Sequence, residues 1–577
     1  MSISQEPPRR AALGRTGPSL AVLSLYLATS VALFGWPLWP HPGRGILGLT
    51  FQDPEIFIWS FAWWAHAIGS FTNPFVTNVV YYPVGANLMW TASAPGLALV
   101  FAPLTALVGP AASYNVAMLL LPALTGWTAF LLCRELIDSS WASIVGGYLF
   151  GFSSYVVSHE YGGEPNLGAF LLPLVALVVL RHLRGALSAR GLAWRLGAIL
   201  ALQFTISTEL TLTVTLALAA GLLIAFAAAS EYRKRIVLAL VPITAAYGIA
   251  AALAAPFVAY LVDGFETGKF VGAADGDLLN IVVPTELIAV GGPMFDSITR
   301  HFATNEIDSD LYLGIPTLIV VGLYTWRHRR EPAARFLAAA LVVAWVLALG
   351  TSLQVDGRRI SSLPWRFANS LPLLSNLVAT RLAVYASLAA SVAVALWIGS
   401  TRGRVFRRPY VLPVLALASI VPATWHVSFA RDPSRPAFFT QALYKRCIPR
   451  GEILALFPYA RFGDSMLWQA ESGFWFKMVE GNLGRDTYPP SFVFADPTVT
   501  ALQFYYYGPN PRPTMPQLKV FAKRRHVDRI VSLESGGYPD AFEMQAFGPS
   551  QLIGGVFVAP ACGHDSLADD TRRIQAH

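Results

Sequence analysis

Charged residues are scarce in this chain. Asp, Glu, Lys and Arg make up 13% of its 577 residues, whereas hydrophobic residues make up 54% and the mean hydropathy is +0.50. A soluble protein of this composition would expose too much apolar surface to water. The composition therefore excludes an ordinary soluble protein and predicts an integral membrane protein.

Several sequence motifs of soluble enzymes and pumps are also missing. The sequence holds no Walker loop, no dinucleotide-binding glycine pattern after a strand, no H-E-x-x-H and no G-x-S-x-G. These absences argue against an ATP-driven pump and against an enzyme that uses a nucleotide sugar. The net charge of +8 does not predict nucleic-acid binding, because the Arg and Lys residues form short blocks between apolar runs, as topology determinants do.

Cysteine is rare, with three residues in the chain. Cys133 lies at an expected membrane boundary, whereas Cys447 and Cys562 flank a polar C-terminal region. A disulfide between these two is allowed if the region lies outside the cytoplasm. Two free thiols are the alternative.

Apolar runs of spanning length follow one another before residue 430. They lie near 19–39, 112–132, 141–157, 165–181, 236–257, 311–326, 334–350, 376–400 and 409–428. A longer run, 196–229, is divided around Ser207-Thr208-Glu209, because a carboxylate at mid-bilayer costs roughly 2.5–3.5 kcal/mol. Placing every basic block on the cytoplasmic side then requires eleven crossings. The Pro-containing segment 94–108 enters the membrane without fully crossing in this arrangement, and a full crossing is the alternative.

The predicted fold is an α-helical polytopic membrane protein with about 11 spans plus a re-entrant or interfacial helix. Its transmembrane domain covers residues 1–430 and has an external loop at 40–111. Residues 437–577 are expected to form an exoplasmic α/β domain, with strands at 451–458 and 526–533. The N-terminus is expected in the cytoplasm, and nearly every unusual polar residue then falls on the outer side.

The first external loop carries the leading candidate for catalysis, Asp53, in the sequence Phe51-Gln52-Asp53-Pro54-Glu55. A carboxylate at a membrane surface can reach both a lipid-borne substrate and water, so Asp53 is a candidate general base, with Glu55 a candidate substrate contact. An Asp followed by Pro is also a good helix start, and the two roles are compatible. The aromatic residues that follow, up to Trp63-Trp64, predict a helix lying in the membrane interface.

Further polar residues of the external segments are candidate binding groups. Tyr81, Tyr82 and Asn87 stand in turn-forming sequences and can line a head-group pocket, or belong to a packed external loop. His159 and Glu160 stand in a short external turn and suit a divalent cation or a proton relay, with a solvated loop as the alternative.

Two ionisable residues fall within or at the ends of apolar runs. Glu209 and Arg381 are expected to face a cavity or to pair with each other, and Arg381 can bind a phosphate through its planar fork. A structural ion pair is the alternative. Asp310 and Tyr312, which follow Asp308, are candidate pocket residues or a polar boundary of a span.

The layout resembles the GT-C superfamily of membrane glycosyltransferases, and bacterial members of unassigned substrate most of all. The resemblance rests on an acidic residue in the first external loop, Asp53, and on a second polar site at His159-Glu160. It also rests on four short patterns: Tyr81-Tyr82-Pro83 to Asn87, Pro103-Leu104-Thr105, Ser113-Tyr114-Asn115 and Gly151-Phe152-Ser153. It covers most of residues 19–400. Adjacent acidic residues in the first loop and an Asp at the second site are common in relatives and are replaced here.

The resemblance implies transfer of a sugar from a polyprenyl-phosphate carrier to a glycan, lipid or protein acceptor at the outer face of a bacterial inner membrane. The implied mechanism is a single inverting displacement with Asp53 as base, assisted by Arg381 or by a divalent metal cation held by His159 and Glu160. A transporter or lipid flippase is one alternative, although no internal repeat supports it. A non-catalytic assembly factor of the cell envelope is another.

Overall fold

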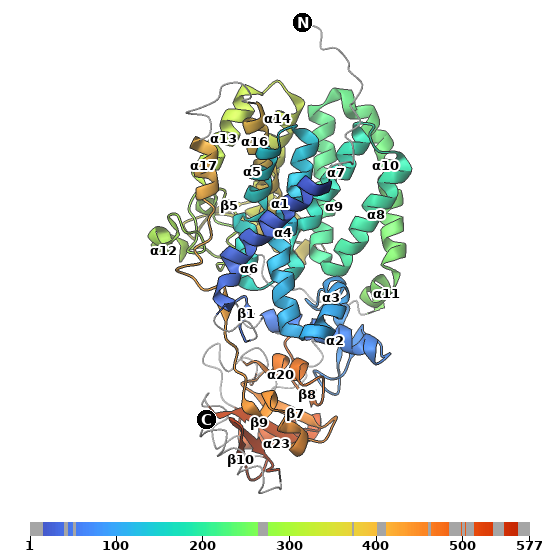
Figure 1. Cartoon of the computed structure of the whole chain (residues 1–577), viewed down its shortest axis with the longest axis vertical. Coiled ribbons are helices and arrows are strands. Elements are labelled where there is room, and N and C mark those ends of the chain that lie inside the picture. The colour runs from blue at the N-terminus through green and yellow to red at the C-terminus, as the bar shows by residue number, and fades with distance from the viewer. Residues whose placement is uncertain are drawn as a thin grey trace.

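The computed structural model describes residues 16–39, 44–49, 53–263, 275–371, 374–400, 411–459, 463–483, 498, 502, 513–534 and 547–562. Within them, a large helical bundle precedes a smaller unit built on a five-stranded sheet, and the two lie at opposite ends of the long axis (Figure 1). The smaller unit, the described part of residues 437–562, is called the C-terminal unit below. The expected domain division at 430 and 437 remains a prediction.

Ten helices of 12 to 27 residues form the main part of the described bundle. They are α1 (Thr16–Ser30), α4 (Pro110–Leu136), α5 (Ser140–Gly151), α7 (Leu172–Leu183), α8 (Ala189–Ile206), α9 (Thr208–Ala228), α10 (Arg233–Leu253), α13 (Ile315–Arg327), α14 (Pro332–Ala348) and α16 (Ala383–Ser400). Further helices join or extend them: α2 (Asp53–Gly69), α3 (Pro95–Val108), α6 (Ser154–Gly162), α11 (Ala255–Asp263), α12 (Asp296–Thr299), α15 (Trp365–Ala368) and α17 (Val411–Ala418). Three two-stranded sheets lie in the described loops of the bundle: β1 (Ile46–Leu47) with β6 (Ala430–Arg431), β2 (Val76–Thr77) with β3 (Ala86–Asn87), and β4 (Ser352–Val355) with β5 (Arg358–Ser362).

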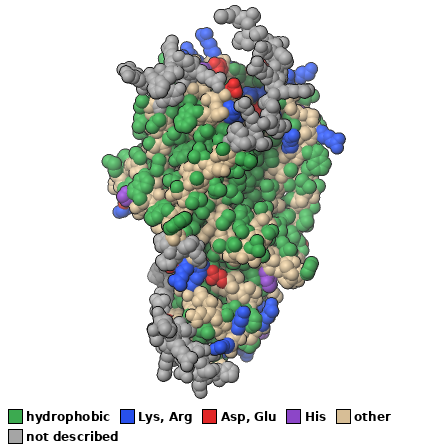
Figure 2. Space-filling model, viewed as in Figure 1, with side chains coloured by type: hydrophobic (Ala, Val, Ile, Leu, Met, Phe, Trp, Pro, Cys, Tyr) green, Lys and Arg blue, Asp and Glu red, His purple; other side chains and the backbone are tan. Residues whose placement is uncertain are grey.

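Six helical segments of the described chain are long and apolar enough to cross a membrane: Ser19–Leu38, Pro110–Leu136, Pro165–Leu183, Thr208–Ala228, Ser230–Leu253 and Ala379–Ser400. Figure 2 shows hydrophobic side chains over the middle of the bundle, with Lys and Arg gathered toward its end away from the C-terminal unit. The protein is therefore a membrane protein, and the expected count of eleven crossings stays a prediction. The helix α3 is 14 residues long, shorter than a span needs, in line with a segment that does not fully cross.

The predicted break near Glu209 is present. α8 ends at Ile206 and α9 begins at Thr208, with Ser207 between them in an extended conformation. The Ser207 hydroxyl accepts a hydrogen bond from the amide of Leu210, 3.1 Å away, and so caps α9. Glu209 therefore lies in the first turn of a helix and not at the centre of a long one.

Two expected spans are wrong as single helices. The run 141–157 is divided into α5 and α6, because Ser153 is extended and starts a new helix. In the run 409–428, α17 ends at Ala418, and the residues after it leave the helix. Pro422 follows, and the backbone of Ala423 instead donates to the carbonyl of Leu287 at 2.8 Å.

The sequence did not predict that α2 is covered by protein, and its expected position in the membrane interface stays a prediction. Nearly every side chain from Pro54 to Trp64 is buried, since α2 packs against α3 and α4 on one side and against α20 (Ser465–Glu471) of the C-terminal unit on the other. A helix that is apolar all round is stable only when it is covered all round. α2 is therefore enclosed between the bundle and the C-terminal unit (Figure 1).

The C-terminal unit contains one mixed sheet with strand order β10-β11-β9-β7-β8. Its strands are β7 (Ile453–Phe457), β8 (Lys477–Met478), β9 (Arg529–Leu533), β10 (Gln551–Ile553) and β11 (Val556–Ala559). β7 pairs in parallel with both β8 and β9, as a strand–helix–strand connection through α20 or α23 (Met515–Arg525) requires. The helices α18 (Ala437–Thr440) and α19 (Tyr444–Cys447) lead into the sheet. Cys447 and Cys562 form a disulfide with a Cα–Cα distance of 5.1 Å, so the free-thiol alternative is set aside.

Candidate active site at the junction of the bundle and the C-terminal unit

Asp53 is the first residue of α2, and its side chain is partly exposed. The next residue, Pro54, packs against the backbone of two glycines. A Cβ atom on Gly163 would lie 2.6 Å from Pro54 Cγ, and one on Gly48 would lie 2.8 Å from the same atom. The start of α2 therefore touches the turn that follows His159 and Glu160, which are 106 and 107 residues further along the chain than Asp53.

Tyr114, in the first turns of α4, holds these segments together. Its hydroxyl lies 3.0 Å from the carbonyl oxygen of Leu47 and 2.9 Å from that of Gly163, so its one proton bridges the two chain segments. The carboxylates of Asp53, Glu160 and Glu164 are all within electrostatic range of this hydroxyl. The two polar sites that the sequence singled out are thus brought together around one buried tyrosine.

His159 is 4% exposed and lies between two carboxylates. Its Nδ1 is 2.9 Å from Glu164 Oε2, and its Nε2 is 3.7 Å from Asp310 Oδ2. Its ring also packs edge-on against Tyr155, with 4.4 Å between centroids. Asp310 comes from the loop before α13, so this contact joins two segments that the sequence was expected to place on the outer side.

Arg381 is the centre of a second set of ion pairs. Its guanidinium lies 2.5 Å from Glu209, 3.3 Å from Asp308 and 3.6 Å from Glu164. The predicted pairing of Glu209 with Arg381 is therefore found. Since three carboxylates surround the guanidinium, an anionic phosphate would have to displace one of them, and the phosphate-binding role of Arg381 stays a prediction.

The charges of the connected cluster do not cancel. Four carboxylates, of Glu164, Glu209, Asp308 and Asp310, contact two cationic side chains, His159 and Arg381. Ionisation of all six leaves an excess of two negative charges. Such a cluster is suited to a cationic or proton-donating partner and repels a free anion.

Burial and these contacts shift the proton affinities in the cluster. Burial alone would lower the pKa of His159, but the Asp310 and Glu164 carboxylates outweigh it and raise the pKa to about 9. Burial raises the pKa of Asp310 to about 6, although His159 opposes this shift. For Glu164, burial is outweighed by Arg381 and His159, which hold its pKa below the usual value. At neutral pH, His159 is therefore a cation between two carboxylates.

Glu160 stands apart from this ion-pair network. It is 5% exposed, its Oε2 atom has no hydrogen-bond partner, and burial holds its pKa well above the usual value. Consecutive residues of a helix point about 100° apart, so His159 and Glu160 do not converge on one ion. Among the residues that the structure describes, no group of three His, Cys, Asp or Glu has a metal-binding arrangement. These two residues therefore fit poorly as a metal pair, and the metal role remains a prediction.

Glu55 is fully buried and forms an ion pair with Arg431 of β6. This contact lies toward the C-terminal unit, so the structure does not bring Glu55 into the cluster around Tyr114. No other described residue hydrogen-bonds to its carboxylate oxygens. Substrate contact by Glu55 would require this pair to open.

Tyr81, Tyr82 and Asn87 also lie outside the cluster. The backbone amides of Tyr81 and Tyr82 donate to the carbonyls of Glu480 and Met478, each at 3.1 Å, and so extend the edge of the C-terminal sheet. The Asn87 side chain donates to the carbonyl of Tyr260 at 2.8 Å. These contacts match the packed-loop alternative, and their substrate-binding role stays a prediction.

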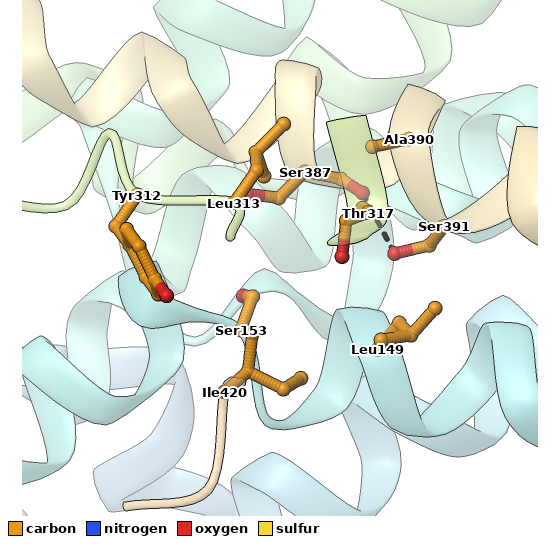
Figure 3. Close-up of a pocket in the computed structure, with 9 residues that line it drawn as sticks. All are labelled: Leu149, Ser153, Tyr312, Leu313, Thr317, Ser387, Ala390, Ser391 and Ile420. Atoms are coloured by element: carbon orange, nitrogen blue, oxygen red, sulfur yellow. Dashed lines mark hydrogen bonds between the residues drawn. The ribbon is translucent and has the colours of Figure 1, made fainter. Parts of the chain in front are cut away.

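Tyr312 lines a small cavity inside the bundle, together with both apolar and hydroxyl-bearing side chains (Figure 3). The cavity measures about 10 Å³, and its hydroxyl-bearing walls come from the α5–α6 junction, α13 and α16. The hydroxyl oxygens of Ser153, Thr317 and Ser387 are buried there with no hydrogen-bond partner among the described residues. This cavity is not lined by Asp53, and the substrate-binding role of Tyr312 stays a prediction.

Two groups at the junction were not predicted as site residues. Tyr114 and Arg431 are named by no catalytic motif, and each acts through contacts with distant parts of the chain. For Tyr114 a signal exists: Ser113-Tyr114-Asn115 is a polar triplet at the start of an apolar span. Asn115 accepts a hydrogen bond from the Leu47 amide at 3.0 Å, so both polar residues secure the segment that leads to Asp53.

A family model described as a domain of unknown function (DUF6311) matches residues 23–421. No curated protein matches the chain in sequence. Several solved structures are similar in fold, two of which follow. The first is the archaeal oligosaccharyltransferase AglB from Archaeoglobus fulgidus, in complex with an inhibitory peptide and a dolichol-phosphate; it is 12% identical over 90% of this chain and 70% of that chain, with a TM-score of 0.54.

The second is the arabinofuranosyltransferase AftD from Mycobacteria, which is 17% identical over 89% of this chain and 36% of that chain, with a TM-score of 0.53. The chain thus spans little more than a third of the length of AftD. At such identities the likeness concerns the fold alone, and the fold is GT-C-like.

Proposed function

The chain belongs to the DUF6311 family, and we propose that it is a glycosyltransferase that moves a sugar from a polyprenyl-phosphate carrier to an acceptor at the outer membrane face. The observation that carries the proposal is the packing of the Asp53–Pro54 helix start on Gly163, beside the buried acidic cluster. The GT-C-like fold supports the reaction class, since AglB is an oligosaccharyltransferase and AftD an arabinofuranosyltransferase.

Asp53 is the proposed general base. The acceptor hydroxyl oxygen attacks the anomeric carbon, its proton passes to the Asp53 carboxylate, and the bond from carbon to phosphate oxygen breaks. The electron pair of that bond leaves with the lipid phosphate, and the configuration at carbon inverts. General-base assistance of this kind contributes roughly 10²–10⁴-fold in rate. His159 and Arg381 are already paired with carboxylates, so either could assist the departing phosphate only after releasing one of these partners.

The proposed site lies at the end of the bundle that carries the C-terminal unit. We place this end outside the cytoplasm and the N-terminus inside it. The disulfide between Cys447 and Cys562 supports this orientation, because such bonds persist mainly in oxidising compartments. We further propose that the protein lies in a bacterial inner membrane and that its acceptor is a lipid, a glycan or a protein.

The test is a transfer assay with purified protein, radiolabelled polyprenyl-phosphate sugars and membrane extract. Asp53→Asn is expected to lower the transfer rate by about 10²–10⁴-fold. A matched control is Glu231→Gln, which removes an exposed carboxylate from the turn between α9 and α10 and is expected to leave transfer unchanged. Equal transfer by wild type and Asp53→Asn overturns the role of Asp53. Movement of labelled lipid across the bilayer without transfer would indicate a flippase.

A further inference from the structure

The buried carboxylate of Glu55 stands two residues after Asp53, in the first turn of α2. Its charge is balanced by the guanidinium of Arg431. A buried carboxylate without such a partner must either take up a proton or move toward water. The position of the first turn of α2 therefore depends on where Arg431 is held.

Arg431 is itself held from two directions. Its backbone lies beside Ile46 in the pairing of β6 with β1, the strand that precedes α2. Its side chain contacts Asp464 Oδ1 at 2.8 Å, and Asp464 Oδ2 accepts a hydrogen bond from the Ser434 amide at 2.7 Å. Asp464 stands immediately before α20. Glu55, Arg431 and Asp464 thus form a continuous bridge from α2 to the C-terminal unit.

The same face of α2 continues into that unit through aromatic contacts. Trp59 Nε1 donates a hydrogen bond to Gln469 Oε1 of α20 at 2.6 Å. The rings of Trp59 and Trp63 stack on each other and meet the edge of Phe474 at centroid distances of 5.6 and 5.3 Å. These contacts lie one to three turns after Asp53, whereas the Glu55–Arg431 pair lies in the first turn itself.

We infer that Arg431 is a positioning residue, through which the C-terminal unit holds the first turn of α2 and thereby sets the place of Asp53. The inference rests on the proposed function for its catalytic consequence, but the mechanical link is measurable without any activity. The C-terminal unit is then part of the active-site scaffold. If the C-terminal unit had only an accessory role, separate from the active site, changes at Arg431 would leave α2 unaffected.

The mildest test variant is Asp464→Asn, which weakens the hold on Arg431 and leaves the Glu55–Arg431 pair in place. Arg431→Lys keeps the charge but replaces the planar guanidinium, whose Nη2 atom contacts both Glu55 and Asp464, with a shorter side chain. The control is Glu471→Gln, because Glu471 pairs with Arg435, at 2.9 Å, and neither residue belongs to the Glu55–Arg431–Asp464 bridge. All three are compared in the full-length protein in detergent.

The first measurement is hydrogen exchange of the amides of residues 56–59, whose hydrogen bonds close the first turn of α2. We expect exchange at least about 10-fold faster in Asp464→Asn and Arg431→Lys than in wild type, with Glu471→Gln unchanged. Exchange in both bridge variants equal to that in Glu471→Gln overturns the inference.

The second measurement is sugar transfer with the kinetic constants separated. A displaced base is expected to lower kcat by about 10-fold or more while KM for the lipid donor changes by less than about 3-fold. Faster exchange with unchanged kcat overturns the catalytic part of the inference. If the wild-type protein transfers no sugar but exchange is faster in the two bridge variants, the proposed function is wrong and the mechanical link is still established.

Discussion

The Nη1 atom of Arg381 lies 2.5 Å from Oε2 of Glu209, a carboxylate 172 residues earlier in the chain. This pair joins the start of α9 to the start of the last long helix of the bundle. Because both groups are largely buried, the pair is part of a network whose members depend on one another.

Loss of Arg381 is expected to be far more damaging than loss of Glu209. Arg381→Met leaves three carboxylates close together without a cation and should destabilise the protein by about 3–5 kcal/mol. Glu209→Gln keeps two carboxylates on Arg381 and should cost about 1 kcal/mol. Thermal unfolding of the two single variants and the double variant measures these losses of stability. Equal losses in the two single variants would mean that Glu209 is the only partner through which Arg381 stabilises the protein.

Replacement of Gly163 is expected to displace the start of α2. Its backbone has φ +74°, which disfavours a side chain, and a Cβ would come within 2.6 Å of Pro54 Cγ and 2.7 Å of the Tyr114 hydroxyl. Gly163→Ala should therefore destabilise the protein and lower sugar transfer about 10-fold or more.

A control for Gly163 is Gly185→Ala, because Gly185 has φ +79° and open space around its Cβ position. It carries the backbone strain without the collision and should cost about 1 kcal/mol without loss of transfer. A similar fall of transfer in both variants would show that the contact with Pro54 is not what matters.

The stability of the protein is expected to fall as the pH rises from neutral toward 9. The pKa of His159 is raised from 6.5 to about 9 in the folded protein, so its stabilising contribution is fully present below 6.5 and is lost as the pH rises through about 9. A shift of this size corresponds to at most about 3 kcal/mol. Melting temperatures between pH 6.5 and 9.5 measure it, and His159→Gln should flatten the slope. An unchanged slope in that variant would assign the loss to other groups.

The small cavity beside Tyr312 is expected to hold one ordered water. Its volume of about 10 Å³ is close to the least that one water molecule needs. The hydroxyls of Ser153, Thr317 and Ser387, which have no hydrogen-bond partner among the described residues, surround it. If a water bridges them, Thr317→Val should cost about 1 kcal/mol, because a hydrogen bond is lost. A stabilising effect would show instead that the hydroxyl has no partner. Thr325→Val is the control, since that hydroxyl donates to its own helix at Val321, 2.8 Å away.

The break at Ser207 was predictable because it follows from local chemistry. A carboxylate at position 209 cannot sit at mid-bilayer, and a serine two residues earlier is a helix cap. The break at Ser153 was missed, since the sequence around it is apolar enough for one span and no charge marks the interruption. The burial of α2 was missed as well, because an aromatic helix looks the same whether lipid or protein covers it.

The sequence by itself determined the membrane class, most helices and the resemblance to GT-C enzymes, because hydropathy, capping and breaks are properties of neighbouring residues. It also singled out Asp53, His159 and Glu160. Only the tertiary structure decided that Asp53 and the His159 turn meet at Tyr114, that Glu55 turns toward Arg431, and that Arg381 is surrounded by carboxylates. These relations depend on how elements more than 40 residues apart pack, and such packing leaves no periodic or local trace in the chain.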